Sequence, residues 1–292
     1  MQLKAVVTGA NGMLGDSFCP LLENKGYHVV AADIIANAKI IKLDIKNLDK
    51  AMYVVKKEKP GIIFHLAAET DVDKCELNEK HAYETNAKGT ENMALCCKEL
   101  DIPMVYISTG AVFDGEKENG YTEEDITGPV NIYGKSKLEG EKVVKALLSK
   151  YYIIRAGWMI GVYNKDKKFV WKIVELLKTK KEISAVTDKF GTPTFTKDLS
   201  KGIYDIVTKG EYGLYHSVNN GGICTRFDIA KKIIEYLNKK DVILKPVDSN
   251  AFPMPAPRPK SEALINHRLF SMGMNNMRTW QEALKEYIEE IK

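Results

Sequence analysis

A glycine-rich stretch, Thr-Gly-Ala-Asn-Gly-Met-Leu-Gly at residues 8–15, directly follows the apolar run at residues 3–7. Such a turn between a strand and a helix lets the backbone approach a pyrophosphate, and the helix N terminus adds N–H groups and partial positive charge. The spacing is G-x-x-G-x-x-G rather than G-x-G-x-x-G. The turn therefore predicts a dinucleotide site lined by Gly9, Asn11, Gly12, Met13, Leu14 and Gly15.

Short apolar runs alternate with helical segments through the first half of the chain. We expect strands at 3–7, 27–33, 40–43, 61–66, 102–107 and 151–155, and helices at 12–26, 47–59, 78–100 and 132–150. Strands joined by helices form a parallel sheet that is covered on both faces, and ligands bind at its carboxyl ends. This pattern predicts an α/β fold with a doubly wound parallel (Rossmann) sheet.

The alternation loosens beyond about residue 160, and residues 190–194 and 249–260 are expected to be irregular. We expect residues 1–160 to form mainly the dinucleotide-binding domain. Residues 161–292 should form mainly a smaller C-terminal substrate-binding lobe, interleaved with the first domain.

Asp33 closes the second expected strand. A carboxylate there accepts hydrogen bonds from the ribose hydroxyls and repels a 2′-phosphate, which favours NAD(H). Lys39 or Lys42 could offset that repulsion, so both NAD(H) and NADP(H) stay open. Asp44 and Ile45 follow the third strand and suit an adenine contact, although Asp44 is equally consistent with a plain surface residue.

Tyr133 and Lys137 lie four residues apart on an expected helix. Residues at this spacing share a helix face, so the ammonium can stand beside the phenol and lower its pKa. Reduction of a ketone needs a proton for the oxygen, and Thr109, at a strand end, can hydrogen-bond the same oxygen. The pattern predicts a carbonyl reductase with these three residues as its catalytic group; the alternative is a Tyr/Lys pair on an exposed helix face.

Composition excludes several other classes of protein. The net charge is +4, from 43 basic and 39 acidic residues, and it is spread along the chain, so no nucleic-acid partner is expected. No apolar run approaches the length of a membrane span. The five cysteines lack metal-type spacing and the histidines are scattered, so we predict no metal and a reduced, cytoplasmic setting. The sequence lacks P-loop and G-x-S-x-G motifs.

At this point the motifs resemble a family, the extended short-chain dehydrogenase/reductases, and within it the dTDP-4-dehydrorhamnose reductases. The resemblance spans nearly the whole chain and rests on residues 8–15, 67–76, 108–113, 133–141, 158, 188–194 and 258–259. It implies NAD(P)H-dependent reduction of the 4-keto group of a dTDP-6-deoxy-hexose, for surface polysaccharide synthesis.

The resemblance also implies site residues. The cofactor would further contact Ala67, Ala68, Glu69, Thr70, Tyr133 and Lys137, and the nucleotide-sugar would contact Val72, Thr109, Gly110, Tyr133, Trp158 and Arg258.

The chain departs from the family pattern in three places. Gly110-Ala111 replaces Asp-Tyr, which is expected to enlarge the substrate pocket, and Arg-Pro-Lys-Ser-Glu at 258–262 adds a carboxylate. Ser17 stands where some members carry a metal-binding Glu that bridges a dimer, so a monomer and a homodimer both remain possible. A nucleotide-sugar 4-epimerase with bound NAD, or a non-catalytic NAD(P)-binding regulatory homologue, remains an alternative function.

Overall fold

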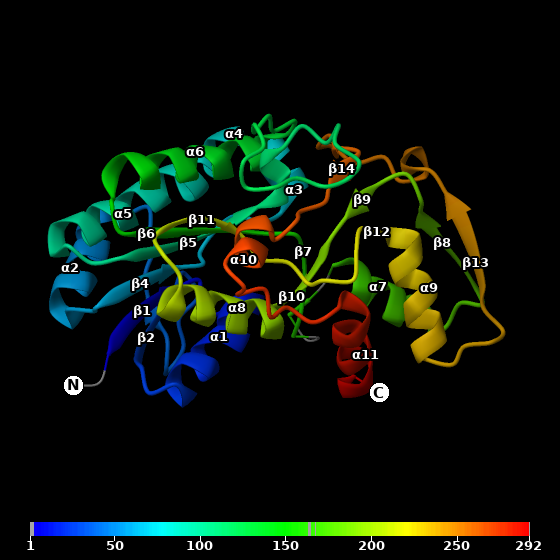
Figure 1. The fold of residues 1–292 in the computed structure, drawn as a ribbon, viewed down its shortest axis with the longest axis horizontal. Coiled ribbons are helices and arrows are strands. Elements are labelled where there is room, and N and C mark those ends of the chain that lie inside the picture. The colour runs from blue at the N-terminus through cyan, green and yellow to red at the C-terminus, as the bar shows by residue number, and fades with distance from the viewer. Residues whose placement is uncertain (1–2, 163–164, 167, 292) are drawn as a thin grey trace.

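In a computed structural model of the chain, which describes residues 3–162, 165–166 and 168–291, seven parallel strands form the central sheet. Their order is β3-β2-β1-β4-β5-β6-β11 (Figure 1). The order reverses direction between β1 and β4, which is the ligand-binding switch point of a doubly wound sheet. The predicted fold class is confirmed.

The strands of this sheet are β1 (Lys4–Thr8), β2 (His28–Asp33), β3 (Ile41–Lys42), β4 (Ile62–His65), β5 (Met104–Thr109), β6 (Tyr151–Ala156) and β11 (Gly213–His216). The helices are α1 (Met13–Asn24), α2 (Leu48–Glu58), α3 (Val72–Leu77), α4 (Glu79–Tyr83), α5 (Gly89–Leu100), α6 (Ile132–Leu147), α7 (Phe169–Leu176), α8 (Thr196–Lys209), α9 (Arg226–Tyr236), α10 (His267–Ser271) and α11 (Trp280–Glu290).

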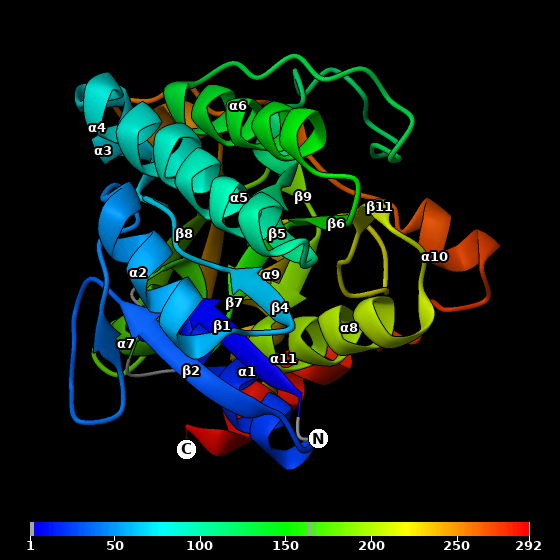
Figure 2. The same cartoon turned by 90° about the vertical axis from the view of Figure 1, so that its left-hand side faces the viewer.

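Successive side chains of β1 point to opposite faces of the sheet, as the two-residue period of a strand requires. Ala5 and Val7 join a core under α1 and α8, while Val6 joins a second core under α2, α5 and α6. Figure 2 shows these two helical layers on either side of the twisted sheet. Burial on both faces explains why the strands are almost wholly apolar.

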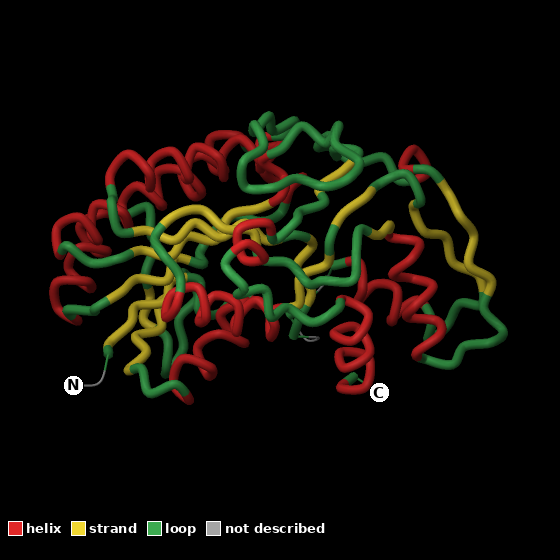
Figure 3. Tube along the Cα trace, in the orientation of Figure 1, coloured by secondary structure: helices red, strands yellow, loops and turns green. Residues whose placement is uncertain are grey.

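The later part of the chain adds three small sheets and its own core. β7 (Trp158–Ile160) pairs with β10 (Pro193–Phe195), β8 (Glu182–Val186) with β13 (Ile243–Val247), and β9 (Phe190–Gly191) lies between β12 (Cys224–Thr225) and β14 (Ser261–Glu262). Side chains of α7, α9 and α11 pack together beside these strands. In Figure 3 the short strands lie apart from the central sheet, on the side of the C terminus.

One expectation about local structure is confirmed and another is wrong. The helix expected at 78–100 is helical without a break from Glu79 to Leu100, and a π-helical turn within it, η1 (Glu84–Lys88), joins α4 to α5. Residues 190–194, expected to be irregular, contain β9 and β10 because partners distant in the sequence pair with them. Residues 249–260 are irregular as expected, apart from one 3₁₀ turn, η3 (Ser249–Ala251).

Candidate active site

The glycine turn lies where β1 and β4 end side by side. Gly9 has φ +71°, and a Cβ on it would lie 2.6 Å from the Ala67 nitrogen, so only glycine fits. A Cβ on Gly15 would lie 2.5 Å from the Ala10 oxygen. Gly12 is the N-cap of α1, and no side chain caps that helix. Uncapped N–H groups at the start of a helix, beside bare backbone, fit the pyrophosphate of a dinucleotide.

The structure brings Asp33 to this turn. Its Oδ2 accepts a hydrogen bond from the Asn11 N–H at 3.0 Å, and its Oδ1 accepts from the Ile35 N–H at 2.9 Å. The carboxylate therefore stands at the end of β2, next to the turn, where a ribose would lie. Lys165, which the sequence reasoning missed, donates to Asn11 Oδ1 at 3.4 Å and to Asp16 Oδ1 at 2.6 Å. It lies 154 residues after Asn11 and 149 residues after Asp16 in the chain.

The other predicted cofactor residues line the ends of β3 and β4. Ile45 is buried in the core, and its carbonyl accepts a hydrogen bond from the Asn92 side chain at 2.9 Å. Asp44 is half-buried, and its Oδ1 accepts from the Lys46 N–H. At this edge of the sheet, Ile45 thus provides backbone that is held in place, and Asp44 provides a carboxylate that is partly accessible.

Asn86, in the π-helical turn, holds the strand-end segment at residues 67–70. Its Oδ1 accepts a hydrogen bond from the Glu69 N–H at 2.8 Å. Its Nδ2 donates to the backbone carbonyl oxygen of Glu69 at 3.1 Å and to Ser136 Oγ at 3.0 Å. The Glu69 carboxylate is itself occupied by Lys74 at 2.6 Å and His81 at 3.1 Å. Both the backbone and the side chain of Glu69 are thus held by protein contacts, which fixes the segment at residues 67–70 at this edge.

His65, the last residue of β4, is fully buried behind the same edge. Its Nδ1 lies 2.7 Å from Thr8 Oγ1, and its Nε2 lies 3.1 Å from Thr90 Oγ1. Because Thr90 donates its own proton to the Asn86 oxygen, the Nε2–H donates to Thr90 and Nδ1 accepts from Thr8. Burial lowers the pKa of His65 to about 3, so this imidazole stays neutral and structural.

Backbone contacts bring Tyr133 to Thr109. The Thr109 side chain caps the short turn η2 (Gly110–Val112), and the Asn131 side chain caps α6 by accepting from the Gly134 N–H at 2.8 Å. A Cβ on Gly134 would collide with the Ala111 oxygen, so the glycine lets the start of α6 lie directly against η2. The Thr109 side chain lies close enough to the Tyr133 phenol to lower its pKa, so the two predicted catalytic residues share one environment.

The pKa values of Tyr133 and Lys137 differ from the expectation. Burial raises the pKa of Tyr133, against the opposing effect of the nearby Thr109 side chain. Burial lowers the pKa of Lys137 to about 7, while the carboxylate of Glu141 opposes the shift. The expected lowering of the tyrosine pKa is therefore wrong for this structure, because desolvation disfavours the phenolate and weakens the neighbouring charge together. Lys137 is 2% exposed, and its Nζ lies 4.1 Å from the centre of the Tyr106 ring.

A buried ionic cluster lies one helical turn beyond Lys137. Glu141 accepts from Ser108 Oγ at 2.6 Å and from two nitrogens of Arg155 at 2.8 and 2.7 Å. The third guanidinium nitrogen of Arg155 lies 3.4 Å from His216 Nε2. The sequence reasoning missed this cluster, although the four-residue step from Lys137 to Glu141 is a usable signal of a shared helix face.

The predicted substrate residues gather around β7, β14 and α3. Trp158 Nε1 donates to Glu262 Oε2 at 2.8 Å. Arg258 pairs with Asp73 at 3.0 Å, which brings its guanidinium to α3 directly after Val72. The expected enlargement of the pocket at Gly110 is wrong, because a Cβ there would lie 2.8 Å from the Glu262 oxygen and 3.3 Å from the Leu264 side chain. Strand β14 occupies that space.

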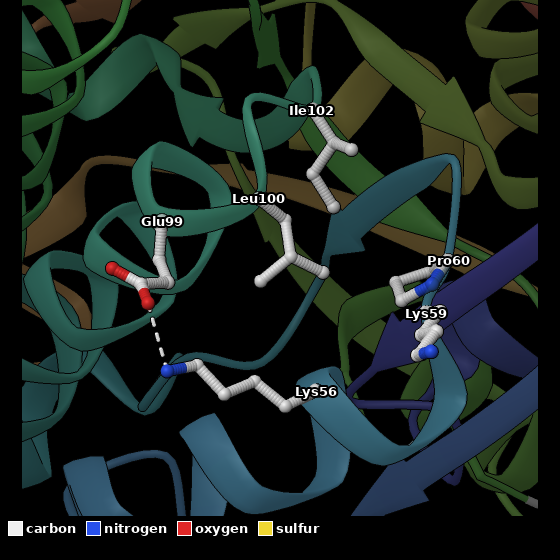
Figure 4. Close-up of a pocket in the computed structure, with 6 residues that line it drawn as sticks. All are labelled: Lys56, Lys59, Pro60, Glu99, Leu100 and Ile102. Carbon is white, nitrogen blue, oxygen red and sulfur yellow. Dashed lines mark ion pairs between the residues drawn. The ribbon is translucent and has the colours of Figure 1, made fainter.

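Two pockets lie outside this site. The pocket in Figure 4, of about 570 Å³, lies at the amino ends of β4 and β5, beside Pro60 and Ile102, and an ion pair of 2.7 Å joins Lys56 to Glu99 across it. A second, of about 400 Å³, lies between α1, α8 and α11 and includes Ser17, whose hydroxyl lies 2.8 Å from that of Thr196. Neither pocket contains a predicted catalytic residue.

Within the described ranges, no three histidine, cysteine, aspartate or glutamate side chains come together as a metal site. No helix in the same part of the chain is long and apolar enough to cross a bilayer.

With the geometry in place, comparison with known proteins identifies the family. The model of the RmlD substrate binding domain family matches residues 3–292. The chain belongs to this family. It is an NAD(P)-dependent reductase of the extended short-chain dehydrogenase/reductase type, and the predicted resemblance is confirmed.

Three relatives illustrate the similarity over the full length. The spore coat polysaccharide biosynthesis protein SpsK of Bacillus subtilis is 34% identical over 287 residues, covering 98% of this chain and 97% of the relative. The dTDP-4-dehydrorhamnose reductase structure from Clostridium acetobutylicum has 38% identity and a TM-score of 0.92, with 99% of each chain covered. The reductase from Bacillus anthracis, solved in complex with NADP, has the same identity and TM-score over 99% of this chain and 100% of that one.

Proposed function

We propose that the chain reduces the 4-keto group of a dTDP-linked 6-deoxy-hexose with NAD(P)H, as a step in surface polysaccharide synthesis. The observation that carries this proposal is the close packing of the start of α6, with Tyr133, against the turn after Thr109, at the same edge of the sheet as the glycine turn and Asp33. Full-length relatives named dTDP-4-dehydrorhamnose reductase support the choice of substrate.

The proposed chemistry divides between the cofactor and the chain. When bound, the reduced nicotinamide supplies a hydride to the keto carbon. The Tyr133 phenol donates its proton to the keto oxygen, which becomes the new hydroxyl. The raised pKa of Tyr133 keeps the phenol protonated at neutral pH, so it is ready to donate.

The neighbours of Tyr133 stabilise the negative charge that develops on the keto oxygen and on the phenolate in that step. The Thr109 hydroxyl shares the hydrogen bond to the keto oxygen, and protonated Lys137 favours the phenolate that remains after transfer. The pKa of Lys137, about 7, lets the same amine bind or release a proton near neutral pH. Thr109, Tyr133 and Lys137 are accordingly our proposed catalytic residues.

The cofactor would lie along the carboxyl edge from β3 to β4. Backbone of the turn at 9–15 would hold the pyrophosphate, Asp33 the ribose, Asp44 and Ile45 the adenine, and residues 67–70 the nicotinamide half. The Asp33 carboxylate supports a preference for NAD(H), and the NADP complex of the Bacillus anthracis relative supports NADP(H). The assay below decides between them.

We also propose the division into residues 1–160, mainly for the cofactor, and residues 161–292, mainly for the substrate. The separate core beside α7, α9 and α11 supports it, and the return of β11 to the central sheet supports interleaving. A reduced, cytoplasmic setting fits the five free cysteines, and we propose that the chain acts as a monomer or homodimer.

The test mixes the purified chain with a dTDP-4-keto-6-deoxy sugar and either NADH or NADPH, and follows the loss of reduced nicotinamide. We expect stoichiometric oxidation and a 6-deoxy-hexose product. Product formation without net consumption of nicotinamide, or cofactor binding with no turnover, contradicts the proposal.

A further inference from the structure

The guanidinium of Arg226, at the first turn of α9, lies against two aromatic rings. Its Cζ lies 3.8 Å from the centre of the Trp158 ring and 5.0 Å from that of Phe169. Both distances are within the range of cation–π attraction, which fixes the plane of the group. The mechanism proposed above makes no use of this residue.

The guanidinium has no acceptor of its own within the described ranges, where it makes neither a hydrogen bond nor an ion pair. The carboxylates of Glu262 and Asp166 act on it only at longer range, and the Asp166 oxygens are already occupied by the N–H groups of Gly161 and Lys168. A guanidinium carries five N–H donors, and in Arg226, which is half-buried, these donors keep some exposed surface and are available to a ligand. An anionic ligand would satisfy them.

The framework that holds Trp158 also places Arg226 relative to Tyr133. In the sheet β12-β9-β14, Gly191 pairs with Cys224 on one side and with Glu262 on the other. A Cβ on Gly191 would collide with the Trp158 indole, so the ring lies directly on the middle strand. Glu262 therefore meets the nitrogen edge of the indole, and Arg226, which follows β12, covers the ring.

Contacts connect the Tyr133 phenol to Arg226 through Glu262 and Trp158. The Glu262 carboxylate raises the pKa of Tyr133 electrostatically and accepts a hydrogen bond from Trp158 Nε1 at 2.8 Å. The Arg226 guanidinium packs over the ring of the same tryptophan. The positive charges of Arg258 and Lys168 lie close enough to interact with Arg226 electrostatically. A carboxylate accepts from sugar hydroxyls, an indole packs against a sugar ring, and clustered cations bind phosphoryl oxygens.

We propose that Arg226 binds the sugar-linked phosphoryl group of the nucleotide diphosphate, with its planar fork held in place by Trp158. The inference rests on the proposed function, because it assumes that the keto sugar lies between Tyr133 and this guanidinium. The phosphoryl group nearer the nucleoside lies beyond Arg226 and makes no contact with it. Arg226 is then a binding residue that fixes how deep the sugar reaches toward Tyr133.

The test compares Arg226→Met with the wild-type chain by calorimetric titration of dTDP and of dTMP, which lacks the sugar-linked phosphoryl group. Because charge-assisted hydrogen bonds are lost, the affinity of Arg226→Met for dTDP should be about 10- to 100-fold lower than that of the wild-type chain. Affinity for dTMP and for NADPH should be unchanged. Arg226→Lys should lose most of the same dTDP affinity, because a single ammonium cannot replace the fork.

Lys231→Met is the matched control, because it removes an exposed cation from the same helix α9. It should bind dTDP like the wild-type chain. Unchanged dTDP affinity in Arg226→Met, or an equal loss for dTMP, overturns the inference while leaving the reductase intact. Arg226-dependent dTDP binding by a wild-type chain that oxidises no nicotinamide with the keto sugar overturns the proposed function instead.

Discussion

Replacing Gly134 with alanine tests whether the close approach of α6 to η2 creates the site. The added Cβ would collide with the Ala111 oxygen and lie 2.9 Å from the Pro129 Cβ. Both neighbours are rigid, so the start of α6 has to move away from η2. Overpacking of this kind typically lowers the free energy of unfolding by about 1–3 kcal/mol.

The larger effect should be on turnover, because Tyr133 is the residue before Gly134 and Thr109 precedes η2. A displacement of about 1 Å between such groups lowers the rate by about 100-fold. The assay is kcat with the keto sugar and reduced nicotinamide, beside thermal unfolding and NADPH titration. Affinity for NADPH should remain, since the glycine turn lies on other strands.

Gly61→Ala is the control for a new methyl group, since its nearest neighbour would be the Leu3 side chain at 3.8 Å, an ordinary contact. It should retain wild-type kcat. A Gly134→Ala chain that turns over as fast as wild type would refute the argument that this contact aligns Thr109 with Tyr133.

Further substitutions separate the roles of the remaining site residues. Tyr133→Phe removes only the phenol, so kcat should fall by about 10²- to 10⁴-fold while NADPH titration is unchanged; wild-type turnover would exclude the phenol as proton donor. Asp33→Ala should shift the ratio of NADH to NADPH affinity toward NADPH by about tenfold or more, and an unchanged ratio would remove Asp33 from the site. Lys137→Met should abolish turnover yet raise the unfolding temperature below pH 7. The folded pKa of about 7 lies below the usual 10.5, so the unfolded chain holds that proton more tightly, and wild-type stability rises with pH between those values. The advantage of Lys137→Met should therefore shrink toward pH 10.5, and a pH-independent difference would contradict the burial of a charged amine.

The central sheet and its cofactor edge were predictable because their signals are local. Apolar runs predict β1, β2, β4, β5 and β6. A glycine turn after the first strand of such a sheet commonly binds the pyrophosphate of a dinucleotide. Parallel strands point their carboxyl ends the same way, so residues at the ends of different strands had to meet. That rule placed Asp33 beside Asn11 and Thr109 near the start of α6.

The substrate half depended on contacts between distant segments, which no local pattern encodes. Trp158 meets Glu262 from 104 residues away, and the strands at 190–195 exist only because remote partners pair with them. Gly110 suggested an open pocket, yet β14 fills that space. The sequence by itself therefore determined the sheet, and it predicted the cofactor edge and the phenol that we propose as proton donor. Tertiary packing alone decided the environment of Tyr133 and Arg226, because burial and charge depend on segments brought together only in the folded chain.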